Sequence, residues 1–197
     1  LKIIHRNKYG FLQGRSIQDC VAWAFEFIHQ YQSSGREIVV LKLDFPKAFD
    51  TFEHTPMLEI MKCMGFDDHW LGWIKCLFST AKSSILLNGT PGRQFFCLRG
   101  VRQGDPLSPL IFVLAADLLQ AAINDAYRAG TLQLPIPVPD NDYPVIQYTD
   151  DTILVMPADI SQAETIKGIL QDYAASVGLG INFQRATLVT TNATAET

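Results

Sequence analysis

The feature that most constrains this chain is a pair of adjacent carboxylates, Asp150 and Asp151, placed between two apolar runs. The runs, 143–148 and 152–156, are rich in aromatic, β-branched and aliphatic side chains, whereas aspartate favours turns. This pattern predicts two strands joined by a tight hairpin with both carboxylates at its tip. Two adjacent negative charges repel each other, so the turn would be stabilised by a cation bound between them, which a third acidic group could help to hold. Taken alone, the pair is also typical of an ordinary solvated turn.

The composition bounds the class of protein. A chain of 197 residues with 48% hydrophobic residues has enough apolar surface for a substantial core, in one large domain or two small ones. The longest charge-free apolar run, 106–116, is too short to span a bilayer. The formal charge of −4 argues against a freestanding nucleic-acid binder. The cysteines form no C-x-x-C pair and are typical of thiols in a reducing compartment: Cys20, Cys63, Cys76 and Cys97.

A third carboxylate, Asp44, ends the apolar run 37–44. The run is dense enough in aliphatic residues to predict a central strand that is buried on both faces. A carboxylate at the end of such a strand is costly unless it is hydrogen-bonded or bound to a metal. Pro46 marks the turn that follows. Asp44 is therefore a second candidate for the site that the Asp-Asp hairpin indicates.

Capping residues and helical spacing predict the remaining elements. Helices are expected from Ser16 to about residue 33, from Thr55-Pro56 to Gly65, from Asp67 or Asp68 to about 78, from Leu107 or Leu110 to about 129, and from the Ser161-x-x-Glu164 capping box to 177. Short strands are expected at 84–87 and 94–98, around the turn signal Asn88-Gly89, and at 179–183 and 186–190. Residues 1–14 read as a basic loop, and Arg15 as a phosphate contact or a solvated cation. The tryptophans of the third helix, Trp70 and Trp73, read as core.

This order of elements predicts an α+β fold in which helices back an antiparallel sheet on one face. If Asp44 neighbours the hairpin in that sheet, three carboxylates meet at one edge. Oxygen ligands without nitrogen or sulfur suit hard cations such as Mg²⁺. Two such ions are the means of in-line phosphoryl displacement in many enzymes. We expect the Asp44 and Asp150 carboxylates to lie on the order of 4–6 Å apart without metal.

Four blocks in order resemble the reverse transcriptases of LINE-type (non-LTR) retrotransposons, plant-like in character. Residues 43–50 (LDFPKAFD) resemble motif A, 100–109 (GVRQGDPLSP) resemble motif B, 148–151 (YTDD) resemble motif C, and 178–183 (GLGINF) resemble motif D. Residues 11–17 (FLQGRSI) resemble the block ahead of motif A. The resemblance covers almost the whole chain, and motif B is its most specific part.

The resemblance implies the palm of a right-handed polymerase with part of the fingers. It implies an RNA-directed DNA polymerase in which Asp44, Asp150 and Asp151 are catalytic and hold two Mg²⁺ ions, with Mn²⁺ as a substitute and the Phe45 carbonyl as a further ligand. The implied nucleotide-binding residues are Phe45, Lys47, Ala48, Phe49, Gln103 and Gly104, with Phe49 under the sugar. The implied partners are an RNA template, a DNA primer, dNTPs and the other domains of a retrotransposon polyprotein, with no membrane. The implied location is the nucleus and cytoplasmic ribonucleoprotein.

Within this family, residues 1–36 and 51–100 are expected to form mainly fingers or palm-flanking segments, and 37–50 and 101–197 mainly palm. The upstream fingers and the thumb are expected to lie outside the chain, so the isolated fragment is expected to be weak or inactive. Three positions depart from the family pattern. Thr149 replaces a smaller alanine, Pro46 is unusual in motif A, and Arg185 stands where motif D has lysine. An arginine is a poor proton donor, so turnover would be slowed or this copy is decaying.

Three alternatives stay open at this stage. A catalytically decayed remnant would keep the fold and bind nucleic acid or protein. A group II intron maturase shares these motifs, and an RNA-dependent RNA polymerase would use similar metals. Phe49 and the Tyr-x-Asp-Asp pattern favour the reverse transcriptase over the RNA polymerase.

Overall fold

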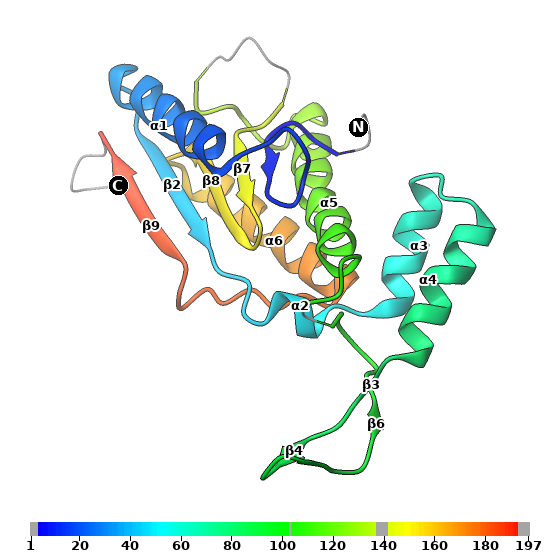
Figure 1. Ribbon diagram of the computed structural model, residues 1–197. Helices are drawn as coiled ribbons and strands as arrows, with labels where there is room; N and C mark the ends of the chain where they lie inside the picture. The colour runs from blue at the N-terminus through cyan, green and yellow to red at the C-terminus, as the bar shows by residue number, and fades with distance from the viewer. Residues whose placement is uncertain (1–3, 103, 137–141, 193–197) are drawn as a thin grey trace.

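A computed structural model describes residues 4–102, 104–136 and 142–192 (Figure 1). Gln103, one of the predicted nucleotide-binding residues, lies outside the described residues. The helices are α1 (Ile17–Ser33), α2 (Ala48–Thr51), α3 (His54–Cys63), α4 (Asp68–Thr80), α5 (Ser108–Arg128) and α6 (Ile160–Val177). The strands are β1 (Lys8–Tyr9), β2 (Ile38–Leu43), β3 (Lys82–Ser83), β4 (Leu86–Leu87), β5 (Thr90–Pro91), β6 (Phe95–Phe96), β7 (Val145–Tyr148), β8 (Asp151–Pro157) and β9 (Thr187–Thr191).

Strand β2 is an interior strand of the five-stranded sheet, whose order is β1-β7-β8-β2-β9. It pairs antiparallel with β8 from Ile38 opposite Pro157 to Leu43 opposite Thr152, and antiparallel with β9 on its other side. The predicted central strand and the β7–β8 hairpin are thus confirmed. Strand β1 adds to the edge parallel to β7, although its segment reads as a loop. A strand of two residues is too short to show the alternation by which strands are recognised.

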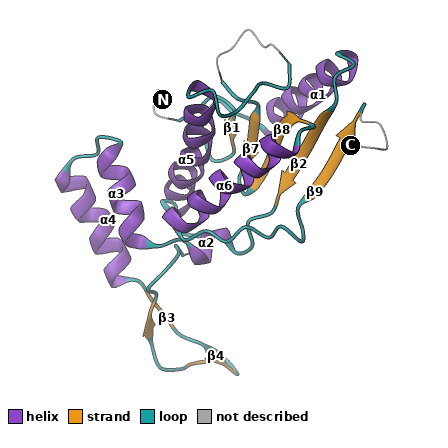
Figure 2. Cartoon of the chain, turned by 180° about the vertical axis from the view of Figure 1, so that it is seen from behind, coloured by secondary structure: helices purple, strands orange, loops and turns teal. Residues whose placement is uncertain are grey.

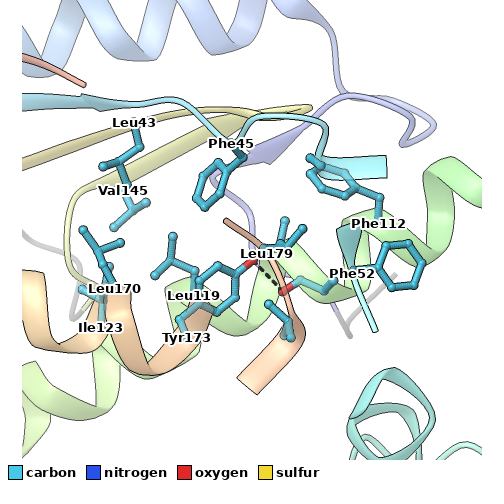
Figure 3. Packing of buried hydrophobic residues seen from close by; sticks show 14 of the residues in the cluster. Leu43, Phe45, Phe52, Phe112, Leu119, Ile123, Val145, Leu170, Tyr173 and Leu179 are labelled. Atoms are coloured by element: carbon cyan, nitrogen blue, oxygen red, sulfur yellow. Dashed lines mark hydrogen bonds between the residues drawn. The ribbon is translucent and has the colours of Figure 1, made fainter. Parts of the chain in front are cut away.

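The main core lies between the sheet and the helices α5 and α6. Leu43, Val145 and Leu154 from the strands meet side chains such as Leu119 and Leu170 from the helices (Figure 3). The Tyr173 hydroxyl in this core donates a hydrogen bond to the Ala115 carbonyl oxygen, 3.2 Å away. Helix α5 is long and apolar enough to cross a membrane by length and composition alone. Half of its most apolar stretch is buried, in the core that it shares with α3, α6 and the sheet.

Helix α1 packs on the opposite face of the sheet, a position that its sequence does not reveal (Figures 1 and 2). Tyr31 of α1 packs against Ile38 and Val155, and Cys20 packs against Ile146. The expected capping box forms, since the Ser16 hydroxyl accepts from the Asp19 amide and the Asp19 carboxylate accepts from the Ser16 amide. The α+β class is therefore confirmed, but the expectation of helices on one face only was wrong, because α1 covers the face opposite α5 and α6.

Four local expectations were wrong. Asp159 caps α6 in place of Ser161, because its carboxylate accepts from two amides of the first turn. Helix α3 begins at His54 after Glu53, just ahead of the expected Thr55-Pro56. Residues 179–183 form no strand, and the Asn182 amide in this loop donates to the Asp44 carbonyl just beyond β2. Trp73 is 57% exposed on the outer face of α4, so only Trp70 of the pair packs against the core.

The turn signal at 88–89 produces a hairpin, with positive φ at both Asn88 (48°) and Gly89 (81°) as a type I′ turn requires. The pairing is less regular than the expected strands 84–87 and 94–98. Strands β4 and β5 pair next to the turn, and β3 pairs with β6 nearer the body of the protein.

Lys8 of β1 is the only fully buried lysine among the described residues. Its Nζ atom donates to Oε1 of Gln147 at 3.0 Å, and Nε2 of Gln147 donates to Oγ1 of Thr152 at 3.3 Å. Burial lowers the pKa of Lys8 to about 7, although attraction to Asp117 opposes the shift. This chain of polar contacts ties the edge strand β1 to the hairpin that carries the two aspartates.

The Lys8 shift predicts how stability depends on pH. An unfolded lysine titrates near 10.5, so between pH 7 and that value the unfolded state holds one more proton than the folded state. The free energy of unfolding should therefore rise with pH, by about 2 kcal/mol between pH 7 and pH 9. Urea unfolding at pH 7 and at pH 9 measures this difference in the free energy of unfolding. In Lys8→Met the increase in the free energy of unfolding should be largely lost. An equal increase in that variant would contradict its assignment to the lowered pKa of Lys8.

Candidate active site

The predicted carboxylates lie at one end of the β2–β8 ladder. The last paired residues there are Leu43 and Thr152. Asp44 follows Leu43, and Asp151 precedes Thr152. In an antiparallel ladder the two aspartates are therefore the next opposite pair. Asp150 occupies the two-residue turn between Tyr148 and Asp151. Strand pairing therefore brings together two carboxylate groups that lie about a hundred residues apart in the sequence.

Two contacts fix the backbone at Asp44. The ring of the next residue, Phe45, is buried in the core and meets Tyr173 edge-on at 6.2 Å between centroids. The amide of Asn182 donates to the Asp44 backbone carbonyl at 3.1 Å. One side-chain oxygen of Asp44, Oδ2, is buried and accepts no hydrogen bond from any residue that the structure describes. Nη1 of Arg185 stands 4.0 Å from that oxygen.

The turn that carries Asp150 is strained. Thr149 has φ +51°, which a β-branched residue rarely adopts, and such residues cost on the order of 1–3 kcal/mol. Its hydroxyl donates to Oδ1 of Asp150 at 2.8 Å. Gly10, after β1, lies against the turn, because a Cβ atom there would be 3.0 Å from Cγ2 of Thr149. The threonine thus orients the carboxylate of Asp150, and the glycine leaves it room.

Lys42 is the cation closest to these carboxylates. Its Nζ atom lies 2.9 Å from Oδ1 of Asp151 in an exposed ion pair. The hydrogen bond to Asp151 is the main cause of the raised pKa of Lys42, and the charges of Asp151, Asp44 and Asp150 add to it. Since all three aspartates act on one ammonium group, they form a single negative field at the strand ends. The sequence pattern did not single out Lys42, because nothing local indicates that it faces Asp151.

The donor chemistry of this edge fits a hard divalent cation. It offers carboxylate oxygens, and the unpartnered Oδ2 of Asp44 is an acceptor without a donor. As the side chains stand, no three His, Cys, Asp or Glu groups among the described residues are gathered to hold a metal ion. The Asp151 carboxylate is instead paired with the Lys42 ammonium group. The separation of 4–6 Å between Asp44 and Asp150 stays a prediction.

The segment after Asp44 is a short turn leading into α2. Lys47 adopts the left-handed conformation (φ 52°, ψ 39°), and its carbonyl accepts from the Asp50 amide at 2.8 Å. The Lys47 side chain is exposed, while Ala48 is buried. Phe49 is half-buried and packs on Phe112, with 4.8 Å between ring centroids. Phe49 is therefore part of the core packing and also keeps part of its ring open to solvent.

The motif B segment is hydrogen-bonded to α2 and to the residue that follows it. The Gly100 amide donates to the Phe52 carbonyl at 2.8 Å, and the Val101 amide donates to the Phe49 carbonyl at 2.7 Å. A Cβ atom on Gly100 would lie 2.5 Å from the Phe49 oxygen, so only glycine fits. Gly104 is exposed with open space around its Cα. A cavity of about 590 Å³ opens beside this segment, lined by residues that include Asp50, Arg102 and Asp105.

Arg15 has neither of its two expected roles. Its guanidinium donates to the backbone carbonyls of Ile4, His5 and Lys8. It thereby closes the loop that leads into β1 and places that strand beside β7. Sequence reasoning misses such a role, because backbone carbonyl groups leave no trace in the pattern of side chains.

Solved structures with the same architecture include telomerases. The apo telomerase from Candida tropicalis truncated from its C-terminal domain superposes with a TM-score of 0.72 at 13% identity, over 97% of this chain and 37% of that chain. The telomerase from Candida albicans in complex with a TWJ fragment of telomeric RNA gives 0.65 at 15% identity, over 88% and 31%. The fold is thus that of a polymerase palm with part of the fingers.

The chain belongs to the reverse transcriptase (RNA-dependent DNA polymerase) family, whose match covers residues 1–195. It is 27% identical to the transposon TX1 uncharacterized 149 kDa protein of Xenopus laevis, over 94% of this chain and 14% of that protein. It is 30% identical to the Pol polyprotein of the type-1 retrotransposable element R2 of Popillia japonica, over 68% and 21%. The resemblance to non-LTR reverse transcriptases is confirmed, and the chain spans a small part of these relatives.

The two glycines of the motif B segment make a matched pair for a stability test. Both have positive φ, 67° at Gly100 and 91° at Gly104, so alanine is strained at either position. Gly104→Ala should cost about 1–2 kcal/mol. Gly100→Ala should cost clearly more, because its Cβ would also collide with the backbone of Phe49 and Asp50. Urea denaturation measures both, and equal losses would contradict the close packing of Gly100.

Removing the charge of Lys42 should strengthen cation binding at the strand ends. Lys42→Gln frees Asp151 and removes one positive charge from the shared field, so Mn²⁺ should bind roughly three- to tenfold more tightly at low salt. Titration followed by Mn²⁺ electron paramagnetic resonance measures it. Arg128→Gln is the control, because it removes a cation that pairs with Asp125 at the far end of α5. Equal affinity in Lys42→Gln and the unaltered chain would contradict a cation site beside Asp151.

Proposed function

We propose that this chain is the core of an RNA-directed DNA polymerase of a non-LTR retrotransposon, which transfers nucleotides onto a DNA primer. The observation that carries the proposal is the β2–β8 register, which sets Asp44 next to Asp151 and the hairpin turn with Asp150. Membership of the reverse transcriptase family supports it. A binding-only remnant and an intron maturase have no specific observation in their favour.

Reverse transcriptases use divalent metal ions, and here two Mg²⁺ ions, or Mn²⁺ as a substitute, would be held by Asp44, Asp150, Asp151 and the Phe45 carbonyl. When bound, such ions activate a 3′-hydroxyl and neutralise charge on the triphosphate and the leaving pyrophosphate. The protein's own part is to hold the carboxylates in place. Buried Phe45 fixes the backbone beside Asp44, and the Thr149 hydroxyl orients Asp150. Lys42 balances the charge of Asp151 while no metal is bound.

The incoming dNTP would bind over the turn between β2 and α2. The backbone from Phe45 to Ala48 would cradle the triphosphate, with the exposed Lys47 ammonium group near its charge. The open part of the Phe49 ring would lie under the sugar, and its packing on Phe112 would keep that wall rigid. Gly104 and Gln103 would line the base pocket, where the open space at Gly104 allows a ligand to approach the backbone.

Arg185 would act in this site as a fixed cation. Its guanidinium already lies near Asp44, on the side where the motif D segment crosses the strand end. A permanently charged group attracts the leaving pyrophosphate but gives it no proton. We therefore expect slower turnover than in the variant Arg185→Lys.

The partners of the whole protein would be an RNA template, a DNA primer, dNTPs and the remaining domains of the polyprotein. The chain corresponds to 14% and 21% of two of its relatives, so these partners belong to the proposal. The place of action would be the nucleus and cytoplasmic ribonucleoprotein.

The proposal is tested in a longer protein that carries the flanking fingers and thumb segments. RNA-templated extension of a DNA primer should require Mg²⁺ or Mn²⁺, and Asp150→Asn should lower its rate by at least about 10³-fold, because metal charge stabilisation contributes several kcal/mol. Asp172→Asn, which removes an exposed charge from α6, is the control and should leave the rate unchanged. Full activity in Asp150→Asn would refute the proposed role of the hairpin.

A further inference from the structure

Phe11 has a backbone conformation that an aromatic residue rarely adopts. Its φ angle is +57°, and the described residues other than glycine that share this positive sign are Phe11, Lys47, Asn88, Thr149 and Asn192. Asparagine adopts the left-handed conformation readily, so Asn88 and Asn192 are ordinary. The other three are strained, and two of them, Lys47 and Thr149, belong to the candidate active site. Strain of this kind persists only where the surrounding structure holds it, and it is concentrated at functional sites.

The neighbours of Phe11 in the chain fix its backbone beside the candidate site. The Tyr9 carbonyl accepts a hydrogen bond from the Thr149 amide at 3.4 Å. A Cβ atom on Gly10 would lie 3.0 Å from Cγ2 of Thr149, so the chain passes close to the turn between β7 and β8. On the other side of Phe11, Leu12 is buried against α5. Phe11 is therefore held between residues that are anchored to two separate elements.

The side chain of Phe11 contacts the residue that is proposed to lie under the sugar. Its ring meets the Phe49 ring edge-on, with 6.4 Å between centroids and 90° between planes. Phe49 also packs on Phe112 of α5, which is buried in the core. The plane of the Phe49 ring is thus set by two rings, one from the core and one from the loop before α1.

Burial does not account for the aromatic side chain at position 11. Phe11 is 48% exposed, so much of its ring lies outside the core. An asparagine would fit the left-handed backbone at lower cost, because its short polar side chain tolerates positive φ. The ring therefore lies where it disfavours the stability of the fold, and its contact with Phe49 is what it offers the site.

We propose that Phe11 is a positioning residue for Phe49, and that it thereby increases the selection of deoxyribonucleotides over ribonucleotides. The inference rests on the proposed function, in which the open part of the Phe49 ring lies under the sugar. An apolar wall excludes a 2′-hydroxyl group only while it keeps its place, because a ring that tilts opens the space that the hydroxyl needs. The edge-on contact with Phe11 opposes such a tilt.

The experiment compares Phe11→Asn with Phe11→Tyr in the longer protein that carries the flanking fingers and thumb segments. Asparagine removes the ring and tolerates positive φ, whereas tyrosine keeps the ring. The ratio of kcat/KM for a ribonucleotide to kcat/KM for the matching dNTP should rise about three- to tenfold in Phe11→Asn, the size expected for one lost ring contact. It should change by less than about twofold in Phe11→Tyr. Phe25→Ala, which removes an exposed ring from α1, is the control and should leave the ratio unchanged.

Two further measurements distinguish positioning from packing. The Tm of the 197-residue chain should not fall in Phe11→Asn, because relief of the backbone strain offsets the lost contact. When Phe49→Val has already removed the neighbouring ring, adding Phe11→Asn should leave the ratio where Phe49→Val sets it. A lowered Tm with an unchanged ratio in Phe11→Asn would make Phe11 a packing residue and overturn the inference. A further rise of the ratio in the double variant would also overturn it, since Phe11 would then act without Phe49.

The Phe49 ring can be followed without DNA synthesis, so the two proposals fail separately. Its flip rate, measured by nuclear magnetic resonance on the 197-residue chain with labelled phenylalanine, should increase in Phe11→Asn and not in Phe11→Tyr. An unchanged flip rate in Phe11→Asn would overturn the inference even if the longer protein synthesises DNA. Full activity in Asp150→Asn would refute the proposed function, while a faster flip would still support the positioning of Phe49 by Phe11.

Discussion

The candidate site depends on the register between β2 and β8. Side chains alternate between faces along a strand, so a slip by one residue would turn Asp44 and Lys42 to the opposite face of the sheet. The register is secured by burial, because Val39 and Leu43 point into the core against α5 and α6. The same apolar contacts that stabilise the fold therefore decide which carboxylates are neighbours.

Charge balance is the second condition that this edge must meet. Three carboxylates at neighbouring strand ends repel one another, and Lys42 and Arg185 lie where they offset that repulsion. One oxygen of Asp44 is nonetheless left without a donor. The positive φ of Thr149 is likewise unfavourable. Such a conformation persists only where the surrounding structure holds it. The unpaired oxygen of Asp44 and the strained backbone at Thr149 thus both cost folding free energy at the strand ends that carry the candidate carboxylates.

The net charge of −4 argues against nucleic-acid binding only when the charge is averaged over the whole chain. The hairpin of residues 82–98, a basic arm, and its root, 99–102, together hold four cations and no carboxylate, while acidic residues dominate elsewhere. A nucleic acid responds to the local field within about a Debye length, roughly 8–10 Å, and not to the sum over the molecule. An acidic body with a basic arm is therefore compatible with membership of the reverse transcriptase family.

The sequence by itself determined the elements whose signals are local. The capping box at Ser16, the strand before Asp44 and the turn at Asp150 are set by side chains a few residues apart, and the candidate carboxylates follow from them. Only the tertiary structure decided which elements meet. The ion pair of Lys42 with Asp151, the contact of Arg185 with Asp44 and the parallel addition of β1 join residues that are distant in the sequence. Periodicity records which face of an element is buried, but not the element against which it packs, because many partners offer the same apolar surface.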